Sequence, residues 1–175
     1  LVEYLVKYFK DSNPFILDIG TGSGCIIISL LQELKRSKGI AIDISNKALK
    51  IAKKNAQLNG FCKRVKFINS SINNFNNSKF DLIVSNPPYI ERHQIKNLSE
   101  DIKNFEPKIA LDGGNDGLDV IKKVIYKSKK ILKINGRLAI EIGNEQNREV
   151  SKILKNNNFR IKYTVKDYKD NIRCL

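Results

Sequence analysis

The chain alternates between short apolar runs and longer amphipathic segments, and this alternation predicts its secondary structure. The predicted strands cover residues 15–19, 39–43, 65–69, 80–85, 136–142, 159–165 and 171–175. Apolar residues three or four positions apart predict helices over residues 1–11, 24–36, 46–59, 117–133 and 145–157. Strands that alternate with helices favour an α/β fold with a doubly wound, mostly parallel sheet. The short link between the last two strands predicts an antiparallel hairpin at one edge.

Two segments do not follow this alternation. Residues 70–79 are polar and rich in asparagine, which predicts mainly a loop. Residues 90–116 have neither a helical nor a strand period. Because long irregular segments in compact domains usually carry function, we expect residues 90–116 to lie over the active site and face the substrate.

The first motif with chemical content is a glycine-rich turn between a predicted strand and a predicted helix. Residues 15–25 read FILDIGTGSGC. The spacing departs from the dinucleotide fingerprint, and no GK[ST] follows, so neither a pyrophosphate site nor a P-loop is predicted. The next strand ends in Asp43, nineteen residues after Gly24, at an offset that suits hydrogen bonds to ribose hydroxyls. The pattern favours a nucleoside without a diphosphate, although a lone glycine turn is also typical of a tight strand–helix connection.

The second motif is Asn86-Pro87-Pro88-Tyr89, directly after the apolar run 80–85. The two prolines cannot donate backbone hydrogen bonds, and each fixes its own φ. The Asn86 side-chain oxygen and the Pro87 carbonyl oxygen can accept both hydrogens of a planar NH2 group, and the Tyr89 ring can pack on its face. This arrangement suits methylation of an amide or aminopurine nitrogen. The alternative is a proline-stiffened turn without chemistry.

Together these motifs resemble the class I S-adenosylmethionine-dependent methyltransferases, and more narrowly the HemK family of protein-(glutamine-N5) methyltransferases. The resemblance covers Leu1 to Leu175. The segments that carry it are LDIGTGSG, NPPYI, Phe105-Glu106-Pro107 with Ala110-Leu111, Gly114 to Leu118, Glu141-Ile142-Gly143 and Asp167 to Arg173. NPPY is shared with nucleic-acid aminomethyltransferases, whereas the segments from Phe105 to Leu118 narrow the match to the glutamine enzymes.

The resemblance implies a Rossmann-like seven-stranded sheet in the order 3-2-1-4-5-7-6, with the antiparallel hairpin at its C-terminal edge. It implies a cytoplasmic enzyme of translation termination that uses S-adenosyl-L-methionine and releases S-adenosyl-L-homocysteine. The expected substrate is the side-chain amide of the glutamine in the GGQ loop of a class I peptide-chain release factor. We expect a monomer that binds neither membranes nor, directly, nucleic acid.

The resemblance also assigns roles to residues. The residues expected at the methionine half of the cofactor are Asp18, Gly20, Thr21, Gly22 and Gly24. Asp43 is expected at the ribose, and Ser71 and Ile72 at the adenine. The family usually has an acid and then a large side chain at these last two positions, so this departure puts the adenine contact in question. Asn86, Pro87, Pro88 and Tyr89 are expected to bind the substrate; Asn86, Pro87 and Tyr89 are the predicted catalytic residues, and Asn86 also borders the cofactor.

Composition changes this interpretation little. The net charge is +14, but 25 lysines against 7 arginines, with 25 isoleucines and 20 asparagines, is typical of an AT-rich genome, and the lysines are scattered. One histidine, His93, and three distant cysteines, Cys25, Cys62 and Cys174, predict no metal site and a reducing compartment. No apolar run approaches the roughly 20 residues of a membrane span.

Two further expectations concern the extent of the chain and its competing functions. The chain has no methionine, even at position 1. Since relatives carry a small helical domain upstream, we expect residues 1–175 to be one catalytic domain taken from a longer protein. The alternatives are an RNA or DNA aminomethyltransferase acting on adenine N6 or guanine N2, and a non-catalytic cofactor-binding module if Ser71 and Ile72 abolish cofactor affinity.

Overall fold

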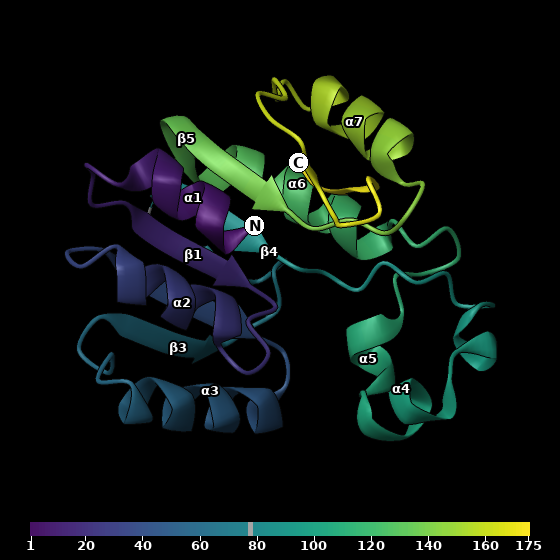
Figure 1. Ribbon diagram of the computed structural model, residues 1–175, viewed down its shortest axis with the longest axis horizontal. Helices are drawn as coiled ribbons and strands as arrows, with labels where there is room; N and C mark the ends of the chain where they lie inside the picture. The colour runs from purple at the N-terminus through teal and green to yellow at the C-terminus, as the bar shows by residue number, and fades with distance from the viewer. Residues whose placement is uncertain (77–78) are drawn as a thin grey trace. The chain divides into compact units, whose positions relative to one another are not determined.

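A computed structural model describes residues 1–76 and 79–175, and these form two compact units (Figure 1). The first unit is Leu1–Ser85 with Lys130–Ala139, and the second is Asn86–Lys129 with Ile140–Leu175. The elements of the first unit are α1 (Val2–Phe9), β1 (Phe15–Ile19), α2 (Cys25–Glu33), β2 (Lys38–Asp43), α3 (Asn46–Leu58), β3 (Val65–Asn69), β4 (Phe80–Ser85) and most of β5 (Leu132–Ile140). Residues 77–78 of the predicted loop lie outside the described residues.

A five-stranded sheet in the order β3-β2-β1-β4-β5 organises the first unit. β1 pairs in parallel with β2 and with β4, and β2 pairs in parallel with β3. The predicted α/β fold with a mostly parallel sheet is therefore confirmed. In the register, Ile19 at the end of β1 lies opposite Ile42 of β2 and Ser85 of β4. Three strands therefore reach their carboxyl ends at the same level.

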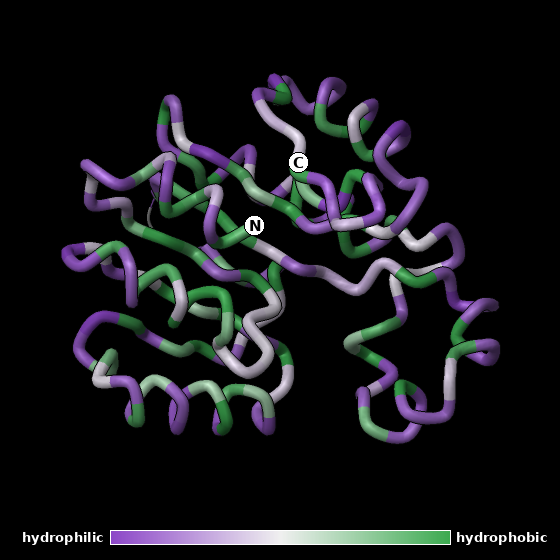
Figure 2. The backbone as a smooth tube through the Cα atoms, viewed as in Figure 1, coloured by the Kyte–Doolittle hydropathy of each residue, from purple (hydrophilic) through white to green (hydrophobic). Residues whose placement is uncertain are grey.

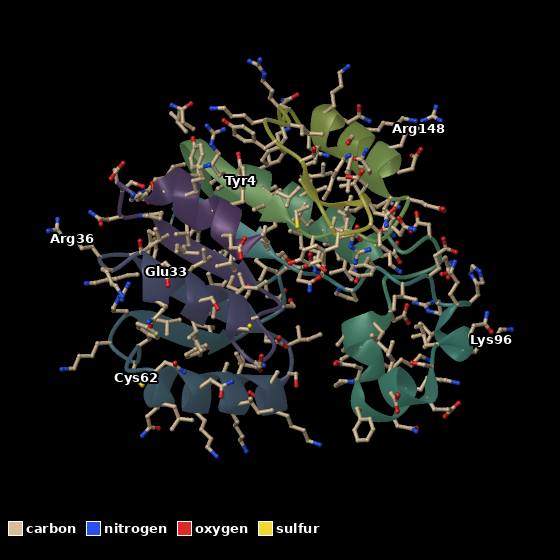
Figure 3. All side chains as sticks on the ribbon, in the orientation of Figure 1. Tyr4, Glu33, Arg36, Cys62, Lys96 and Arg148 are labelled. Carbon is tan, nitrogen blue, oxygen red and sulfur yellow. The ribbon has the colours of Figure 1, made fainter. Side chains whose placement is uncertain are left out.

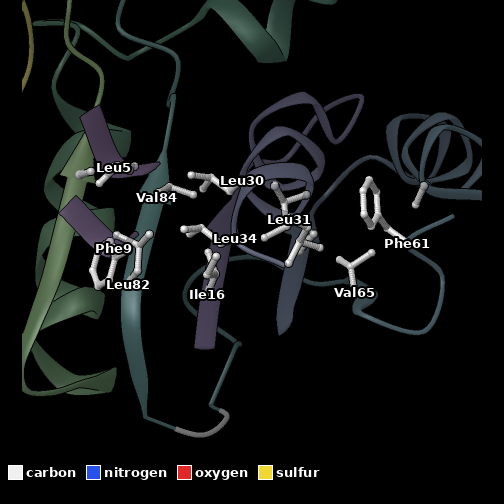
Figure 4. Close-up of a cluster of buried hydrophobic side chains, with 14 residues drawn as sticks. Leu5, Phe9, Ile16, Leu30, Leu31, Leu34, Phe61, Val65, Leu82 and Val84 are labelled. Carbon is white, nitrogen blue, oxygen red and sulfur yellow. The ribbon is translucent and has the colours of Figure 1, made fainter. Parts of the chain in front are cut away.

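One apolar cluster packs the helices of this unit against its sheet (Figure 4). Each of the five strands contributes to the cluster, and so do α1, α2 and α3. Its strand residues are Ile16, Ala41, Val65, Leu82, Val84 and Ala139, and its helix residues include Leu5, Phe9, Ile27, Leu30, Leu31 and Ala56. The alternate residues of the central strands, Leu17 and Ile83, are also fully buried. Burial of both faces explains why these strands read as continuous apolar runs rather than alternating ones.

α3 shows how local sequence sets an element's ends. Apolar and polar residues alternate along it with a helical period (Figure 2). The Ser45 hydroxyl accepts a hydrogen bond from the Ala48 N–H (3.2 Å), and Ser45 is thus the N-cap of α3. At the other end, Gly60 has a φ of 76°, a left-handed conformation that suits glycine after a helix.

The second unit contains η1 (Ile95–Asn97), α4 (Glu100–Phe105), α5 (Lys108–Leu111), most of α6 (Asp119–Ile131), α7 (Asn147–Asn156), β6 (Val165–Lys166) and β7 (Ile172–Cys174). β6 and β7 form the predicted antiparallel hairpin. The Ile140 and Leu175 backbones exchange hydrogen bonds (2.9 and 3.0 Å), and the Ile142 N–H donates to the Arg173 carbonyl (2.9 Å). Residues 140–142 thus run beside the last strand. β6 and β7 nevertheless form a two-stranded sheet of their own, separate from the five-stranded one.

The strand predicted over residues 159–165 is wrong except at its last residue, since β6 is only Val165–Lys166. Ile161 and Tyr163 alternate with polar residues as in a strand, but they are 37% and 46% exposed. Without a surface to pack against, that alternation does not produce a strand.

The segment without periodicity, residues 90–116, contains three short helical turns, η1, α4 and α5. Backbone hydrogen bonds join its two ends: the Ile90 N–H donates to the Leu111 carbonyl (3.1 Å), and the Gly113 N–H donates to the Ile90 carbonyl (2.8 Å). Between these ends the segment is exposed, and the Phe105 side chain is 83% accessible. The segment is therefore a loop closed at its base, with a solvated outer part.

Charged side chains project from well-separated parts of the chain, as Arg36, Lys96 and Arg148 illustrate (Figure 3). Among residues 1–76 and 79–175, no helix is both long and apolar enough to cross a membrane.

Candidate active site

β1 delivers a buried carboxylate to the start of the glycine loop. Asp18 is only 1% exposed. The Thr21 hydroxyl donates a hydrogen bond to Asp18 Oδ2 (2.6 Å), while Oδ1 has no hydrogen-bond partner among the described residues. Burial raises the pKa of the Asp18 carboxyl from 3.8 to about 6, against the opposing effect of the Thr21 hydrogen bond. Oδ1 is thus a buried acceptor that a polar ligand or a water molecule could use.

The glycine loop leaves open space beside its backbone. Gly20 and Gly22 have φ values of 69° and 56°, and a Cβ at either position would meet no atom within 4 Å. Gly24 differs, because a Cβ there would lie 3.1 Å from the Ile28 side chain and 3.2 Å from that of Ala52. Gly20 and Gly22 therefore permit a ligand to approach the backbone, whereas Gly24 is required by the packing of α2.

Asp43, at the end of β2, holds the loop in place. Its Oδ2 accepts a hydrogen bond from the Gly22 N–H (2.9 Å), and its Oδ1 accepts one from the Ser45 N–H (2.8 Å). The Gly20 and Thr21 N–H groups both donate to the Ile42 carbonyl (2.9 and 3.1 Å). Each carboxylate oxygen still has a lone pair, so Asp43 can also accept hydrogen bonds from two vicinal hydroxyls.

Ser71 and Ile72 follow β3 in the same unit, and both are partly buried. The Ser71 hydroxyl accepts a hydrogen bond from the Asn74 N–H (3.3 Å). Just upstream, the Asn69 side chain donates to the Asp43 and Ile44 carbonyls (both 3.0 Å). Asn69 thereby ties the end of β3 to the end of β2. The first unit thus brings together Asp18, the glycine loop, Asp43 and this segment.

The NPPY motif, considered within the second unit, forms a corner that begins at Asn86. Asn86 is exposed, Pro87 is buried, and Pro88 and Tyr89 are partly buried. Within the described part of the chain the Asn86 side chain makes no hydrogen bond, so its oxygen retains its capacity to accept one. The Tyr89 hydroxyl accepts a hydrogen bond from Arg173 Nη2 (2.9 Å), and the Arg173 Cζ lies 5.3 Å from the ring centroid. The hydroxyl of Tyr89 is therefore occupied by the protein itself.

Two residues of this unit were not predicted from the sequence as site residues, Gln146 and Arg173. Gln146 Nε2 donates to the Tyr89 carbonyl (3.0 Å). The signal that could have found Gln146 is its place at the start of α7, where a shorter capping residue is usual. Over residues 1–76 and 79–175, no group of three or more histidine, cysteine, aspartate or glutamate side chains could hold a metal ion.

Residues 10–173 match the family described as the methyltransferase domain. Release factor glutamine methyltransferase of Fusobacterium nucleatum is 44% identical over 178 residues, which is all of this chain and 50% of that protein. The protein of the same name from Agrobacterium fabrum is 41% identical, over all of this chain and 62% of its own length. The chain thus spans between half and two thirds of the length of these relatives.

Solved structures share the fold. The ribosomal protein L11 methylase of Lactobacillus delbrueckii has a TM-score of 0.73 at 21% identity, over 98% of this chain and 72% of that one. Magnesium protoporphyrin IX methyltransferase of Synechocystis, solved with bound SAM, has a TM-score of 0.67 at 17% identity, over 99% of this chain and 76% of that one. The family match covers most of the chain, and the neighbours have the same fold; the chain belongs to the methyltransferase-domain family.

Proposed function

We propose that this chain is the catalytic part of an S-adenosylmethionine-dependent enzyme that methylates the side-chain amide nitrogen of a glutamine in a peptide-chain release factor. The observation that carries the proposal is the exposed Asn86 amide, which has no recorded hydrogen bond in the described chain and stands in an NPPY corner. Relatives of 41–44% identity bear the name release factor glutamine methyltransferase. Release factors act in translation, so the reaction would be cytoplasmic.

The residues of the first unit fit the proposed cofactor. Asp43 would accept hydrogen bonds from its ribose hydroxyls, and the open backbone at Gly20 and Gly22 would admit its methionine part. The unsatisfied Asp18 Oδ1 would face the same part. When bound, S-adenosylmethionine supplies an electrophilic methyl group on a positively charged sulfur. Ser71 and Ile72 are proposed at the adenine without the acid that is usual in the family.

The NPPY corner would orient the substrate amide. Asn86 Oδ1 and the Pro87 carbonyl would each accept one hydrogen of the glutamine NH2 group, which fixes the plane of that nitrogen and increases its electron density. The corner contains no general base, so we propose that the proton is lost to water. The residue before the corner is fixed within the first unit. Ser85, which precedes Asn86, donates its hydroxyl hydrogen to the carbonyl of Ile19, which precedes Gly20 (2.9 Å).

The function is tested by incubating the chain with labelled S-adenosylmethionine and a purified class I release factor. A release factor in which the GGQ glutamine is replaced by alanine provides the control. Label in the first protein and none in the second supports the proposal. Label in total tRNA or DNA, supplied in parallel reactions, and none in release factor would identify a nucleic-acid methyltransferase instead.

The corner's role predicts a graded response to substitution of Asn86. Asn86→Ala should lower the turnover of methyl transfer by about 10²–10³-fold, because one hydrogen-bond acceptor for the reacting group is lost. Asn86→Asp should keep partial activity, since a carboxylate still accepts N–H hydrogen bonds. Cofactor affinity and melting temperature should stay near those of the parent. Asn156→Ala, an exposed asparagine on α7, is the control; near-normal turnover in Asn86→Ala would show that the corner is only structural.

Substitution of Asp43 should weaken cofactor binding. Asp43→Ala removes the proposed ribose acceptor together with the acceptor of the Gly22 N–H, so calorimetry should show a loss of about 1.5–3 kcal/mol. Asp43→Asn keeps one acceptor oxygen and should lose less. Unchanged affinity in Asp43→Ala would remove this residue from the site.

Asp18 predicts a pH dependence of cofactor affinity. The pKa of its carboxyl is about 6 without a ligand, and a nearby positive charge on the cofactor would favour the ionised form. Binding below pH 6 must then release a proton, so affinity should be about tenfold weaker at pH 5 than at pH 7.5. Asp18→Asn should bind with an affinity that changes little over this range. Parallel profiles for the two proteins, measured by calorimetry, would contradict the placement of Asp18 beside the cofactor's charge.

A further inference from the structure

We infer that Gln146 is a positioning residue that fixes the NPPY corner by holding the backbone of Tyr89. Its side chain makes three hydrogen bonds: Nε2 donates to the Tyr89 carbonyl (3.0 Å) and the Gly117 carbonyl (3.3 Å), and Oε1 accepts from the Gly143 N–H (2.8 Å). Both amide hydrogens and the amide oxygen are thereby used. One side chain thus joins three segments of the second unit. The inference rests on the proposed function for its catalytic meaning.

The partners of Gln146 also determine which way its amide faces. Two carbonyl oxygens require the NH2 group, and one backbone N–H requires the oxygen, so the opposite orientation would break all three hydrogen bonds. This complementarity distinguishes Gln146 from a residue that merely fills space. Glutamate, which has the same shape, cannot replace it at neutral pH because a carboxylate has no hydrogen to donate.

Two glycines leave the room that this arrangement needs. A Cβ on Gly117 would collide with the Tyr89 carbonyl oxygen and would lie 2.7 Å from Gln146 Nε2. A Cβ on Gly143 would lie 2.8 Å from Gln146 Oε1 and 3.1 Å from Tyr89 Cδ2. A side chain at Gly117 would collide with backbone, and one at Gly143 would force the Gln146 amide to shift. The glycines of the DGL and EIG segments are therefore explained by the approach of Gln146 to Tyr89.

The residues at the start of α7 are not those that would best stabilise the helix, and the contact between Gln146 and Tyr89 depends on them. Gln146 occupies the N-cap position, but its side chain makes no capping hydrogen bond, and serine, threonine, aspartate or asparagine would be preferred there. The preceding residue, Glu145, has a φ of 67°, which is unfavourable for a residue with a side chain. Departures from local preference of this kind are expected where a residue serves function rather than the element that contains it.

The prolines explain why the corner needs such an anchor. Pro87 and Pro88 have no N–H, so neither can be fixed by a donated backbone hydrogen bond. Tyr89, which follows them, is held at its carbonyl by Gln146 (3.0 Å) and at its hydroxyl by Arg173 (2.9 Å). Because a misplacement of about 1 Å can cost about 10²-fold in rate, loss of the Tyr89 anchor should be felt at Asn86.

The test compares Gln146→Glu with the parent. The variant keeps an acceptor for the Gly143 N–H but places a negative charge against two carbonyl oxygens. We expect turnover of methyl transfer to fall by about 10–100-fold, with cofactor affinity unchanged, because the three hydrogen-bond partners of the Gln146 side chain, Tyr89, Gly117 and Gly143, are not among the proposed cofactor residues. Turnover relative to the parent should recover partly at pH 5.5–6, where a protonated glutamate can again donate one hydrogen bond. Gln57→Glu, the same substitution at an exposed position of α3, should match the parent.

Hydrogen exchange provides a readout that does not depend on activity. The Ile90 and Arg92 N–H groups, which donate to the Leu111 and Gly114 carbonyls, should exchange faster in Gln146→Glu, while those of the glycine loop should not. Unchanged exchange over residues 86–92 would overturn the inference, whatever the activity. If the parent transfers no methyl group, the proposed function fails and exchange alone decides whether Gln146 holds the corner.

A neutral variant separates positioning from general stability. Gln146→Met has similar length and no charge, and it should show the same faster exchange and lower turnover without the recovery at low pH. If both Gln146 variants unfold, or if cofactor affinity falls together with turnover, Gln146 is a general structural residue and the inference is wrong.

Discussion

Parallel pairing of β1 with both β2 and β4 sets the level at which the candidate site of the first unit begins. The register places Ile19 opposite Ile42 and Ser85, so three strands end at one level. Peptide groups at these ends have no further partner in the ladder, and the loop that follows uses them: the Gly20 and Thr21 N–H groups donate to the Ile42 carbonyl. The glycine loop is thus a continuation of strand pairing into a turn, and Asp43 completes it through Gly22.

How far sequence predicts this fold depends on how deeply each segment is buried. β1 and β4 begin and end at the predicted residues, because apolar runs bounded by polar turns are unambiguous when both faces are covered. The bounds of β3 also match, although this edge strand exposes Lys66 and Asn69. Residues 159–165 fail for the opposite reason: their alternation is that of a strand, but the side chains stay exposed. Residues 90–116 form turns too short to show a period, and they are fixed by hydrogen bonds at Ile90 between distant ends of the loop.

Some residues of the candidate site could likewise be predicted from the sequence, and others could not. Asp18, Asp43 and the glycine loop could be found because each occupies a strand end or a tight turn, where spacing along the chain already implies proximity. Gln146 meets Tyr89 across 57 positions of sequence, and its one local signal, a long residue at an N-cap position, does not point to Tyr89. Only the fold shows that NPPY, DGL and EIG converge on one amide. Segments such as DGL and EIG, which carry the resemblance but have no evident role in their own element, are therefore candidates for positioning the reacting groups rather than for contact with the substrate.

Asp18 lowers the stability of the first unit at neutral pH. A carboxyl whose pKa is raised from 3.8 to about 6 is ionised at neutral pH, and its burial then costs the folded state about 3 kcal/mol relative to the protonated acid. Below pH 3.8 the carboxyl is protonated in both the folded and the unfolded state, so this cost is absent. It develops as the pH rises from 3.8 through about 6. Asparagine would keep an acceptor for the Thr21 hydroxyl without this cost, so the fold alone does not explain the aspartate. The proposed cofactor would explain it, because a positive charge next to Oδ1 would stabilise the buried carboxylate and offset the cost of its burial.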